Sequence, residues 1–463
     1  DLEGRGSFDL WIMRVNDKGD LLSSRTYGGT AYDISSPGGS DYDRAGPGNS
    51  VQVLRDGGVV ISGSSRSNDG DVIGAHGGYD AWLLRLSKSD TLATGIAARG
   101  QLSPLKPLKP KQEPAPLQAP AIEWSKLYGG SDNDSPLDSA QAVINLPSGG
   151  FAFVASSSSN DGGLKSHGDF DVWVVRTDPR GQVLWQKNFG GSGKETGASL
   201  TATHDGGLAF IATTDSQDGD VQKNLGSSDI WVVKLDANGK IQWSRSLGGS
   251  SQDQGWSITA AANGDLVIGG VTYSSDGDIH DHLGGQDFWV ARLNSAGMLL
   301  WSRSLGGPSN DYLTQVVVTP SNDIAAVGRT ESQEGMGQDN HGMYDYLLVR
   351  LAGDGRVLWS RTYGGRDWEW GNSVTATRDG GFLMSGFTYT FDDFERGQVK
   401  CNHGEMDYWL ARVDAQGDLM WQQCLGGTNY ELAYGVIETS DGGFVVAGGS
   451  ASLDGQVIGS RGG

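Results

Sequence analysis

One motif recurs seven times and constrains the fold more than any other feature of the chain. An aromatic residue or Leu precedes a Gly-Gly pair, and a carboxylate follows four residues after the second glycine. The second glycines are Gly29, Gly130, Gly191, Gly249, Gly307, Gly365 and Gly427, and the acids are Asp33, Asp134, Glu195, Asp253, Asp311, Glu369 and Glu431. From Gly130 onward the motif returns every 58 to 62 residues. A period of this kind indicates a stacked or radial array of repeats.

Within one period the residue pattern predicts four short strands. In the unit that ends at Gly249 we expect strands at 199–203, 208–213, 229–235 and 241–247. Turns rich in Asp, Asn and Gly separate the first two strands and the last two, and such short hairpins make the strands antiparallel. Four antiparallel strands per unit are typical of a propeller blade. The whole chain, residues 1–463, therefore reads as one all-β domain, a seven-bladed β-propeller whose blade joints are the seven Gly-Gly pairs.

Most tryptophans fall at fixed strand positions. The third strand carries Asp-x-Trp with a cation three residues after the Trp, and the fourth strand carries a second Trp. The third-strand positions are Trp11, Trp82, Trp173, Trp231, Trp289, Leu347 and Trp409, and the fourth-strand positions are Ser23, Trp124, Trp185, Trp243, Trp301, Trp359 and Trp421. Because bulky rings at fixed positions fill the wedge between radial blades, 12 of the 15 Trp are interpreted as scaffold.

The two ends of the chain complement each other. The chain begins with a third and a fourth strand and ends with a first and a second strand. N-terminal strands three and four paired with C-terminal strands one and two would complete the seventh blade and remove two exposed sheet edges. The segments 1–7 and 453–463 both resemble the loop between strands two and three, so part of that loop is present twice.

The repeat resembles that of a known class of proteins. The pattern Trp-x-Lys/Arg-x-Tyr/Leu-Gly-Gly-Ser, followed by Asp-Gly-Gly, Asp-Gly-Asp and Asp-x-Trp, is similar to the repeat of secreted bacterial surface proteins and distantly similar to Kelch-type propellers. The resemblance covers all of the chain except the insert near 90–121, and it implies the propeller fold rather than a particular activity.

Composition restricts the partners and the compartment. A net charge of −21 argues against a nucleic-acid partner, because phosphate binding needs clustered Lys and Arg. The sequence contains no run of 18 apolar residues, so it predicts no membrane-spanning helix. Two cysteines cannot form a disulfide scaffold, but Cys401 and Cys424 fall within one repeat and could pair. With its start at Asp1 the chain reads as a mature or excised fragment, and we expect an extracellular or cell-surface protein, with the periplasm as the alternative.

The best candidate contact surface comes from loops in which neighbouring blades depart from the repeat. Blades five to seven carry aromatic residues outside the scaffold positions, namely Tyr312, Trp368, Trp370, Phe391, Phe394 and Tyr430. Such residues could stack on sugars, anchor a protein, or pack under long loops. On the opposite face, residues 87–121 form a Pro-rich and Lys-rich insert in blade one, which is either a tolerated loop or a tether for a partner.

Three further patterns have a structural and a chemical interpretation. Asp-Gly-Asp loops could bind calcium through their oxygens or could only form turns, and their acids are Asp69, Asp71, Asp218, Asp220, Asp276 and Asp278. Histidines in one register, His76, His167, His341 and His403, are interpreted as loop-packing residues because Leu occupies the same position in other units. The seven acids after the Gly-Gly pairs either rim the central channel or accept hydrogen bonds in their own loops, and we favour the structural role.

No catalytic motif emerges from the sequence. We therefore expect a non-enzymatic extracellular module for binding or assembly, which recognises a protein or a glycan over blades five to seven and needs no cofactor apart from a calcium ion that the loops could hold. The alternatives are a carbohydrate-active enzyme that uses carboxylates of the loop face and a structural subunit of a surface filament or complex.

Overall fold

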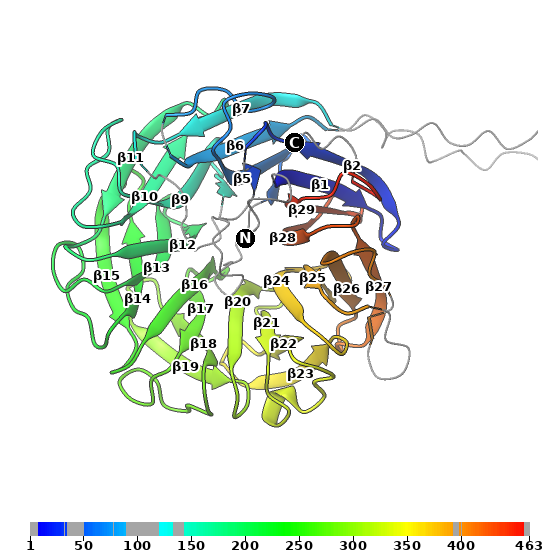
Figure 1. The fold of residues 1–463 in the computed structure, drawn as a ribbon. Helices are drawn as coiled ribbons and strands as arrows, with labels where there is room; N and C mark the ends of the chain where they lie inside the picture. Colours follow the sequence, from blue (N-terminus) through cyan, green and yellow to red (C-terminus); the bar gives the residue numbers. More distant parts are fainter. Residues whose placement is uncertain are drawn as a thin grey trace, which may run out of the picture.

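Seven four-stranded units form a closed ring, as the sequence predicts (Figure 1). The computed structural model describes residues 8–31, 33–34, 51–76, 78–88, 120–132, 143–391, 398–399 and 401–457. Within these residues all regular structure is β apart from one 3-10 turn, η3 (Gly335–Gly337). The prediction of an all-β, seven-bladed propeller of antiparallel blades is confirmed.

Each blade runs from an inner strand near the central axis to an outer strand at the rim. Blade one consists of β3 (Asp33–Ile34) with β4 (Val51–Val53), β5 (Val59–Ser65), β6 (Asp80–Leu86) and β7 (Ile122–Tyr128), and blade two of β8 (Val143–Asn145), β9 (Phe151–Ser157), β10 (Asp171–Thr177) and β11 (Val183–Phe189). Blade three consists of β12 (Glu195–Ala202), β13 (Leu208–Thr214), β14 (Asp229–Leu235) and β15 (Ile241–Leu247). Blade four consists of β16 (Asp253–Ala260), β17 (Leu266–Thr272), β18 (Asp287–Leu293) and β19 (Leu299–Leu305). Blade five consists of β20 (Asp311–Val318), β21 (Ile324–Thr330), β22 (Asp345–Leu351) and β23 (Val357–Tyr363). Blade six consists of β24 (Glu369–Ala376), β25 (Phe382–Thr388), β26 (Asp407–Val413) and β27 (Leu419–Leu425). Blade seven consists of β28 (Glu431–Glu438), β29 (Phe444–Ser450), β1 (Asp9–Val15) and β2 (Leu21–Tyr27).

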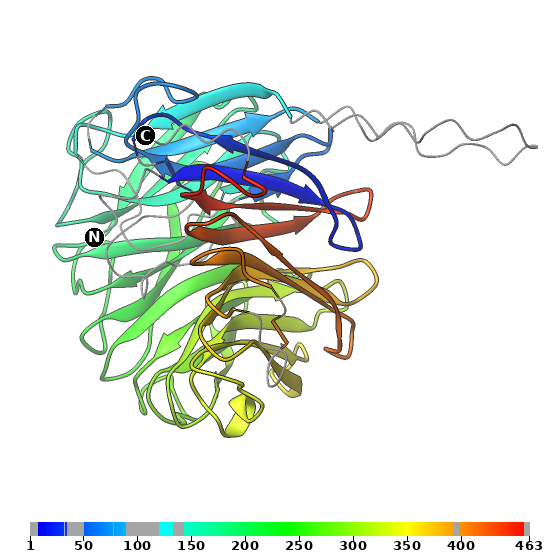
Figure 2. The ribbon, with the colours of Figure 1, turned by 45° about the vertical axis from the view of Figure 1, so that its right-hand side comes forward.

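The ring closes inside blade seven. Strand β1 pairs over its full length with β29 in antiparallel register, from Asp9 opposite Ser450 to Val15 opposite Phe444. The first strand of the chain thus lies beside the last, as both ribbon views show (Figure 2). Because the sheets pack face to face around the ring, closure leaves no blade with an uncovered face at a chain end.

The core is divided among the joints between blades. The third-strand tryptophans, such as Trp231, are fully buried, and Leu347 takes this place in blade five. Each outer-strand Trp then reaches the next blade: Trp185 of blade two contacts the hairpin of blade three at Gly239, whose φ of 71° places it in the left-handed region. A Cβ at Gly239 would lie 3.0 Å from the indole of Trp185, so glycine serves both the turn and the close approach.

The inner strands differ from the sequence prediction. We expected the inner strand of blade three at 199–203, whereas β12 begins at Glu195. The register between β12 and β13 shifts between Gly197 and Ser199. This bulge breaks the alternation of apolar and polar residues, so the first half of the strand carries no period of two.

Candidate functional site

The carboxylates that follow the Gly-Gly pairs are buried at the start of the inner strands. At Glu369, the Gly365 N–H donates to Oε2 at 2.6 Å and the Thr388 hydroxyl donates to Oε1 at 2.6 Å. The same bond from the second glycine is made to each of Asp33, Glu195, Asp253, Asp311 and Glu431. Asp134 lies outside the described residues. These six acids therefore hold their own Gly-Gly turns and are not exposed at the rim of the central channel.

A second buried carboxylate stands beside each of these acids. It belongs to the Asp of Asp-x-Trp, and a Cβ built at Gly364 would collide with both Asp345 and Glu369. Burial, with a smaller contribution from the nearby Asp345 carboxylate, raises the pKa of Glu369 to about 7. Burial likewise raises the pKa of Asp311 to about 6. Glycine at the first position of the pair thus leaves the room that the two acids need.

The histidine register has a more specific role than loop packing. In each case the imidazole Nδ1 faces the Asp that begins the third strand four residues on, for example at 2.8 Å from Asp345 in His341. This hydrogen bond raises the pKa of His341. The other pairs are His76 with Asp80, His167 with Asp171 and His403 with Asp407. The i, i+4 spacing of His and Asp was the sequence signal for these pairs.

The Asp-Gly-Asp loops clamp the Gly-Gly turns. The first acid accepts a hydrogen bond from the residue after the pair, as Asp218 does from Ser192 N at 2.7 Å, and the second accepts from the first glycine, as Asp220 does from Gly190 N at 3.3 Å. Asp276 and Asp278 repeat this arrangement, as do Asp69 and Asp71. Within the described part of the chain no group of three or more His, Cys, Asp or Glu side chains could hold a metal ion.

The aromatic residues predicted for the contact surface occupy two layers. Trp370 is 3% exposed and belongs to a buried cluster. This aromatic cluster consists of Phe8, Trp370, Phe387, Met406, Leu432, Tyr434 and Ala451, against which Tyr344, Tyr389 and Tyr430 pack. It draws on blades five, six and seven, so the structure brings together the departures from the repeat that the sequence singled out, with Trp370 as support rather than contact.

Arg329 locks one edge of the aromatic cluster. Its guanidinium carbon lies 3.6 Å from the ring centre of Trp370 and 4.1 Å from that of Tyr312, and the side chain is 4% exposed. A guanidinium between two aromatic faces is attracted by both rings and fixes their positions. Arg329 was not predicted from the sequence. It lies in the second strand of blade five, at the position that Val271 occupies in blade four, and a cation in place of an apolar residue could have identified it.

The outer layer of this site is formed by half-buried and exposed rings. Trp368 is 37% exposed, its Nε1–H donates to the Met343 sulfur at 2.9 Å, and its ring centre lies 6.0 Å from that of Tyr389. The Tyr389 hydroxyl donates to Glu405 at 3.2 Å. Phe391 is exposed, and Phe394 lies outside the described residues. An accessible indole thus stands on a rigid aromatic base beside hydrogen-bonding groups.

Cys401 and Cys424 form a disulfide, with their Cα atoms 5.7 Å apart. The bond joins the loop before β26 to the outer strand β27 of blade six, one of the blades that build the aromatic cluster. Among the described residues, none of the helical structure has the length and apolar character that crossing a membrane requires.

Comparisons with known proteins agree on little beyond architecture. No family model matches the chain. Over 333 residues it is 24% identical to the regulatory protein FlaEY of Caulobacter vibrioides, and the match covers 64% of this chain but only 34% of that protein. The chain thus spans about a third of the length of this relative.

Three of the solved structures to which the chain is similar share little sequence with it. The WD40 domain of Neurospora crassa Pan2 is 9% identical, with 91% of this chain and 94% of that chain covered and a TM-score of 0.45. An α-L-arabinanase of Penicillium chrysogenum complexed with arabinobiose is 10% identical, with 81% and 92% covered and a TM-score of 0.42. The polysaccharide lyase Uly1 is 12% identical, with 95% and 99% covered and a TM-score of 0.36. The function of this chain has to be argued from its own residues.

Proposed function

We propose that this propeller is a non-enzymatic binding module that acts outside the cytoplasm and recognises a glycan over blades five to seven. The observation that carries the proposal is Trp368, an accessible indole beside the half-buried ring of Tyr389, which packs against the aromatic cluster. A large ring that is exposed but already packed against a neighbouring ring loses little conformational entropy when a ligand binds.

The groups around the exposed ring suit a sugar. A sugar offers an apolar C–H face and a rim of hydroxyls, so its site combines an aromatic platform with a few hydrogen-bonding groups. Here Glu405 accepts from Tyr389, whose ring lies beside Trp368, and Tyr344, which bridges to Trp368 through its backbone, interacts with Glu331. These carboxylates keep further hydrogen-bonding capacity that sugar hydroxyls can use.

The burial of the acids supports binding rather than hydrolysis. Glycoside hydrolysis needs two carboxyl groups that reach the scissile bond. Two carboxyl groups with raised pKa values, Glu369 and Asp311, are fully buried and bonded to their Gly-Gly turns. They lack the access to a substrate that a general acid requires.

The disulfide and the relative's name support the remaining parts of the proposal. Disulfides persist in oxidising compartments, so the Cys401–Cys424 bond agrees with a location outside the cytoplasm. The name of the Caulobacter relative, a regulatory protein, agrees with a role without catalysis.

A glycan array tests the proposal. The wild-type protein should bind a subset of polysaccharides without releasing products, and Trp368→Ala should bind at least about 30-fold more weakly, as the loss of a contact worth about 2 kcal/mol predicts. The melting temperature should not change, because Trp368 is half out of the core. Leu300→Ala removes another exposed apolar side chain, on β19, and is the matched control. Equal binding by wild type and Trp368→Ala would refute the site.

A protein ligand is the second candidate. The exposed Met343 and Phe391 side chains, at 55% and 60%, add apolar surface that a sugar does not need. If the array stays blank, affinity purification with wild type and Trp368→Ala as paired baits decides: a partner that is lost only with the variant supports this second function at the same surface.

A further inference from the structure

Six of the seven blade joints contain the same indole contact. The outer-strand Trp of one blade packs on the positive-φ glycine in the outer hairpin of the next blade, and in five joints its Nε1–H also donates to a carbonyl of that hairpin, as Trp243 does to Ser295 O at 3.1 Å. The other four donors are Trp185, Trp301, Trp359 and Trp421. In the sixth joint Trp124 contacts Gly181.

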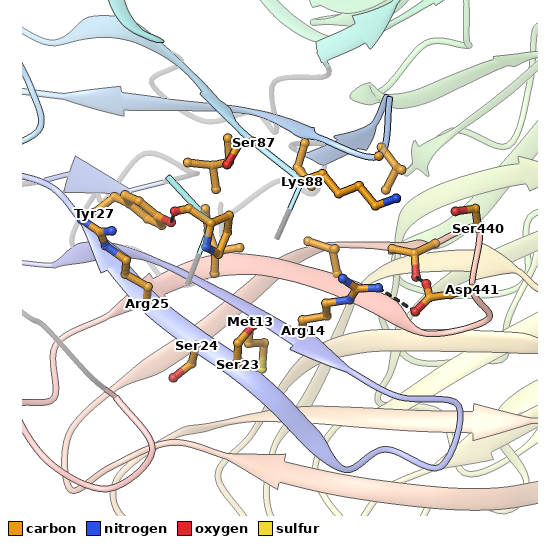
Figure 3. Close-up of a pocket in the computed structure, with 18 residues that line it drawn as sticks. Met13, Arg14, Ser23, Ser24, Arg25, Tyr27, Ser87, Lys88, Ser440 and Asp441 are labelled. Atoms are coloured by element: carbon orange, nitrogen blue, oxygen red, sulfur yellow. Dashed lines mark hydrogen bonds and ion pairs between the residues drawn. The ribbon is translucent and has the colours of Figure 1, made fainter. Parts of the chain in front are cut away.

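The joint between blades seven and one lacks this indole. Ser23 pairs with Arg14 in the register in which Trp243 pairs with Lys234, so Ser23 occupies the Trp position of blade seven. A cavity of about 220 Å³ lies here, and Ser23 is among its lining residues (Figure 3). The cavity is therefore located where the other joints hold a tryptophan ring.

Other contacts hold this joint without the indole. The Tyr27 hydroxyl donates to Pro120 O at 2.9 Å in blade one, and Ile12 and Val445 of blade seven share a hydrophobic cluster with Val59 of blade one. In other joints the equivalent tyrosine works beside the Trp, as Tyr363 does beside Trp359. Blades seven and one are thus joined although the Trp position holds only Ser23.

The lining combines an apolar wall with an excess of cations. Ile12, Val59 and Val445 are among the apolar residues. Three cations, Arg14, Arg25 and Lys88, and one carboxylate, Asp441, line the cavity, and Asp441 forms an ion pair with Arg14 at 2.6 Å. This local excess of positive charge is unusual in a chain with a net charge of −21, and it favours the binding of an anion in the cavity. The volume is below the roughly 300–1,000 Å³ of sites for drug-sized molecules, so a ligand of one or two rings fits.

We propose that this cavity binds a small planar aromatic carboxylate from solution. The ring takes the place of the missing indole between blades seven and one, and the carboxylate is bound by Arg25, which lies on the same strand as Ser23. Arg25 already stacks over the Tyr27 ring, with its guanidinium carbon 4.8 Å from the ring centre, which orients it at the cavity wall. The site is independent of the glycan surface over blades five to seven.

Calorimetric titration with indole-3-acetate tests the proposal on the full chain. Indole-3-acetate should bind with one site per molecule, neutral indole should bind more weakly, and acetate alone should give no signal at the same concentration. Ser23→Trp supplies the ring from the protein itself, so it should abolish binding and raise the melting temperature. Saturable binding that persists in a folded Ser23→Trp variant, or no binding by the wild type, would overturn the proposal.

A second variant keeps the test decisive if Ser23→Trp does not fold. Arg25→Gln should weaken indole-3-acetate roughly tenfold through the loss of a charge-assisted hydrogen bond, while the affinity for neutral indole stays the same. The matched control is Arg303→Gln, at the Arg25 position of blade four, where Trp301 fills the joint. This control should bind both ligands as the wild type does. Equal losses for indole and indole-3-acetate in Arg25→Gln would contradict the assignment of the carboxylate.

Discussion

At Glu369 two physical effects act against each other on one proton. The Gly365 N–H and the Thr388 hydroxyl stabilise the carboxylate, whereas complete burial disfavours its charge. Burial is the larger effect, and the pKa rises from an ordinary 4.5 to about 7. A Gly-Gly turn that has to accommodate two buried carboxyl groups thus binds a proton more tightly than the unfolded chain does.

This raised pKa makes stability dependent on pH. Because the folded state binds the proton more tightly, the contribution of Glu369 is complete below about pH 4.5 and is lost as the pH rises through about 7. A shift of this size corresponds to a few kcal/mol, on the order of 3. We expect the free energy of unfolding in urea to fall less steeply between pH 5 and pH 8 in Glu369→Gln than in the wild type. The exposed Glu334→Gln is the control, and parallel profiles for wild type and Glu369→Gln would contradict the argument.

The roles of some residues could not be predicted from the sequence because they depend on which side chains pack against them in the fold. The sequence identified Trp370 as a departure from the repeat, but only the fold shows that its ring is covered by Phe387 at 5.2 Å and by Arg329. Ser23 was visible as a missing Trp, whereas the cavity that results depends on the facing blade. Position within a repeat is encoded locally, and burial is decided by contacts that are distant in sequence.

At the scale of elements, the outer-strand Trp couples one blade to the next. Trp243→Ser should lower the free energy of unfolding by roughly 3 kcal/mol, near the lower end for loss of a large core ring because this indole is only half-buried. Trp243→Phe keeps a ring on Gly297 but loses the hydrogen bond to Ser295 O, and it should cost about 1 kcal/mol. Urea unfolding checks both values; equal effects of Ser and Phe would show that ring packing does not hold the joint.

Strands were predictable where they alternate and where they are covered on both faces. The predicted third and fourth strands of blade three, 229–235 and 241–247, coincide with β14 and β15 because Asp-x-Trp and the Asn-Gly turn fix their ends. The first half of the inner strand β12 could not be predicted, since the bulge after Gly197 interrupts the alternation of apolar and polar residues. Regular hydrogen-bonding ladders leave a sequence period, and bulges remove it.

At the scale of the whole molecule, ring closure depends on one strand pair formed by the two ends of the chain. The seven residues of β1 pair with the seven of β29, and β2 adds the outer edge. This closure was predictable from the complementary ends, because a propeller needs four strands in every blade. Without β1 and β2, blade seven would keep two strands and expose the paired edge of β29.

Deletion of residues 1–31 tests this dependence. We expect the truncated chain to lose its cooperative thermal transition and to associate through the exposed edge of β29, which light scattering and a melting curve would detect together. Replacing 89–119 with a short Gly-Ser turn removes a similar number of residues and is the control. The Ser87 N–H donates to Ala121 O at 2.8 Å at the base of that insert, so the control should keep the wild-type melting temperature. A monomeric, cooperatively folded truncated protein would mean that six blades close without the seventh.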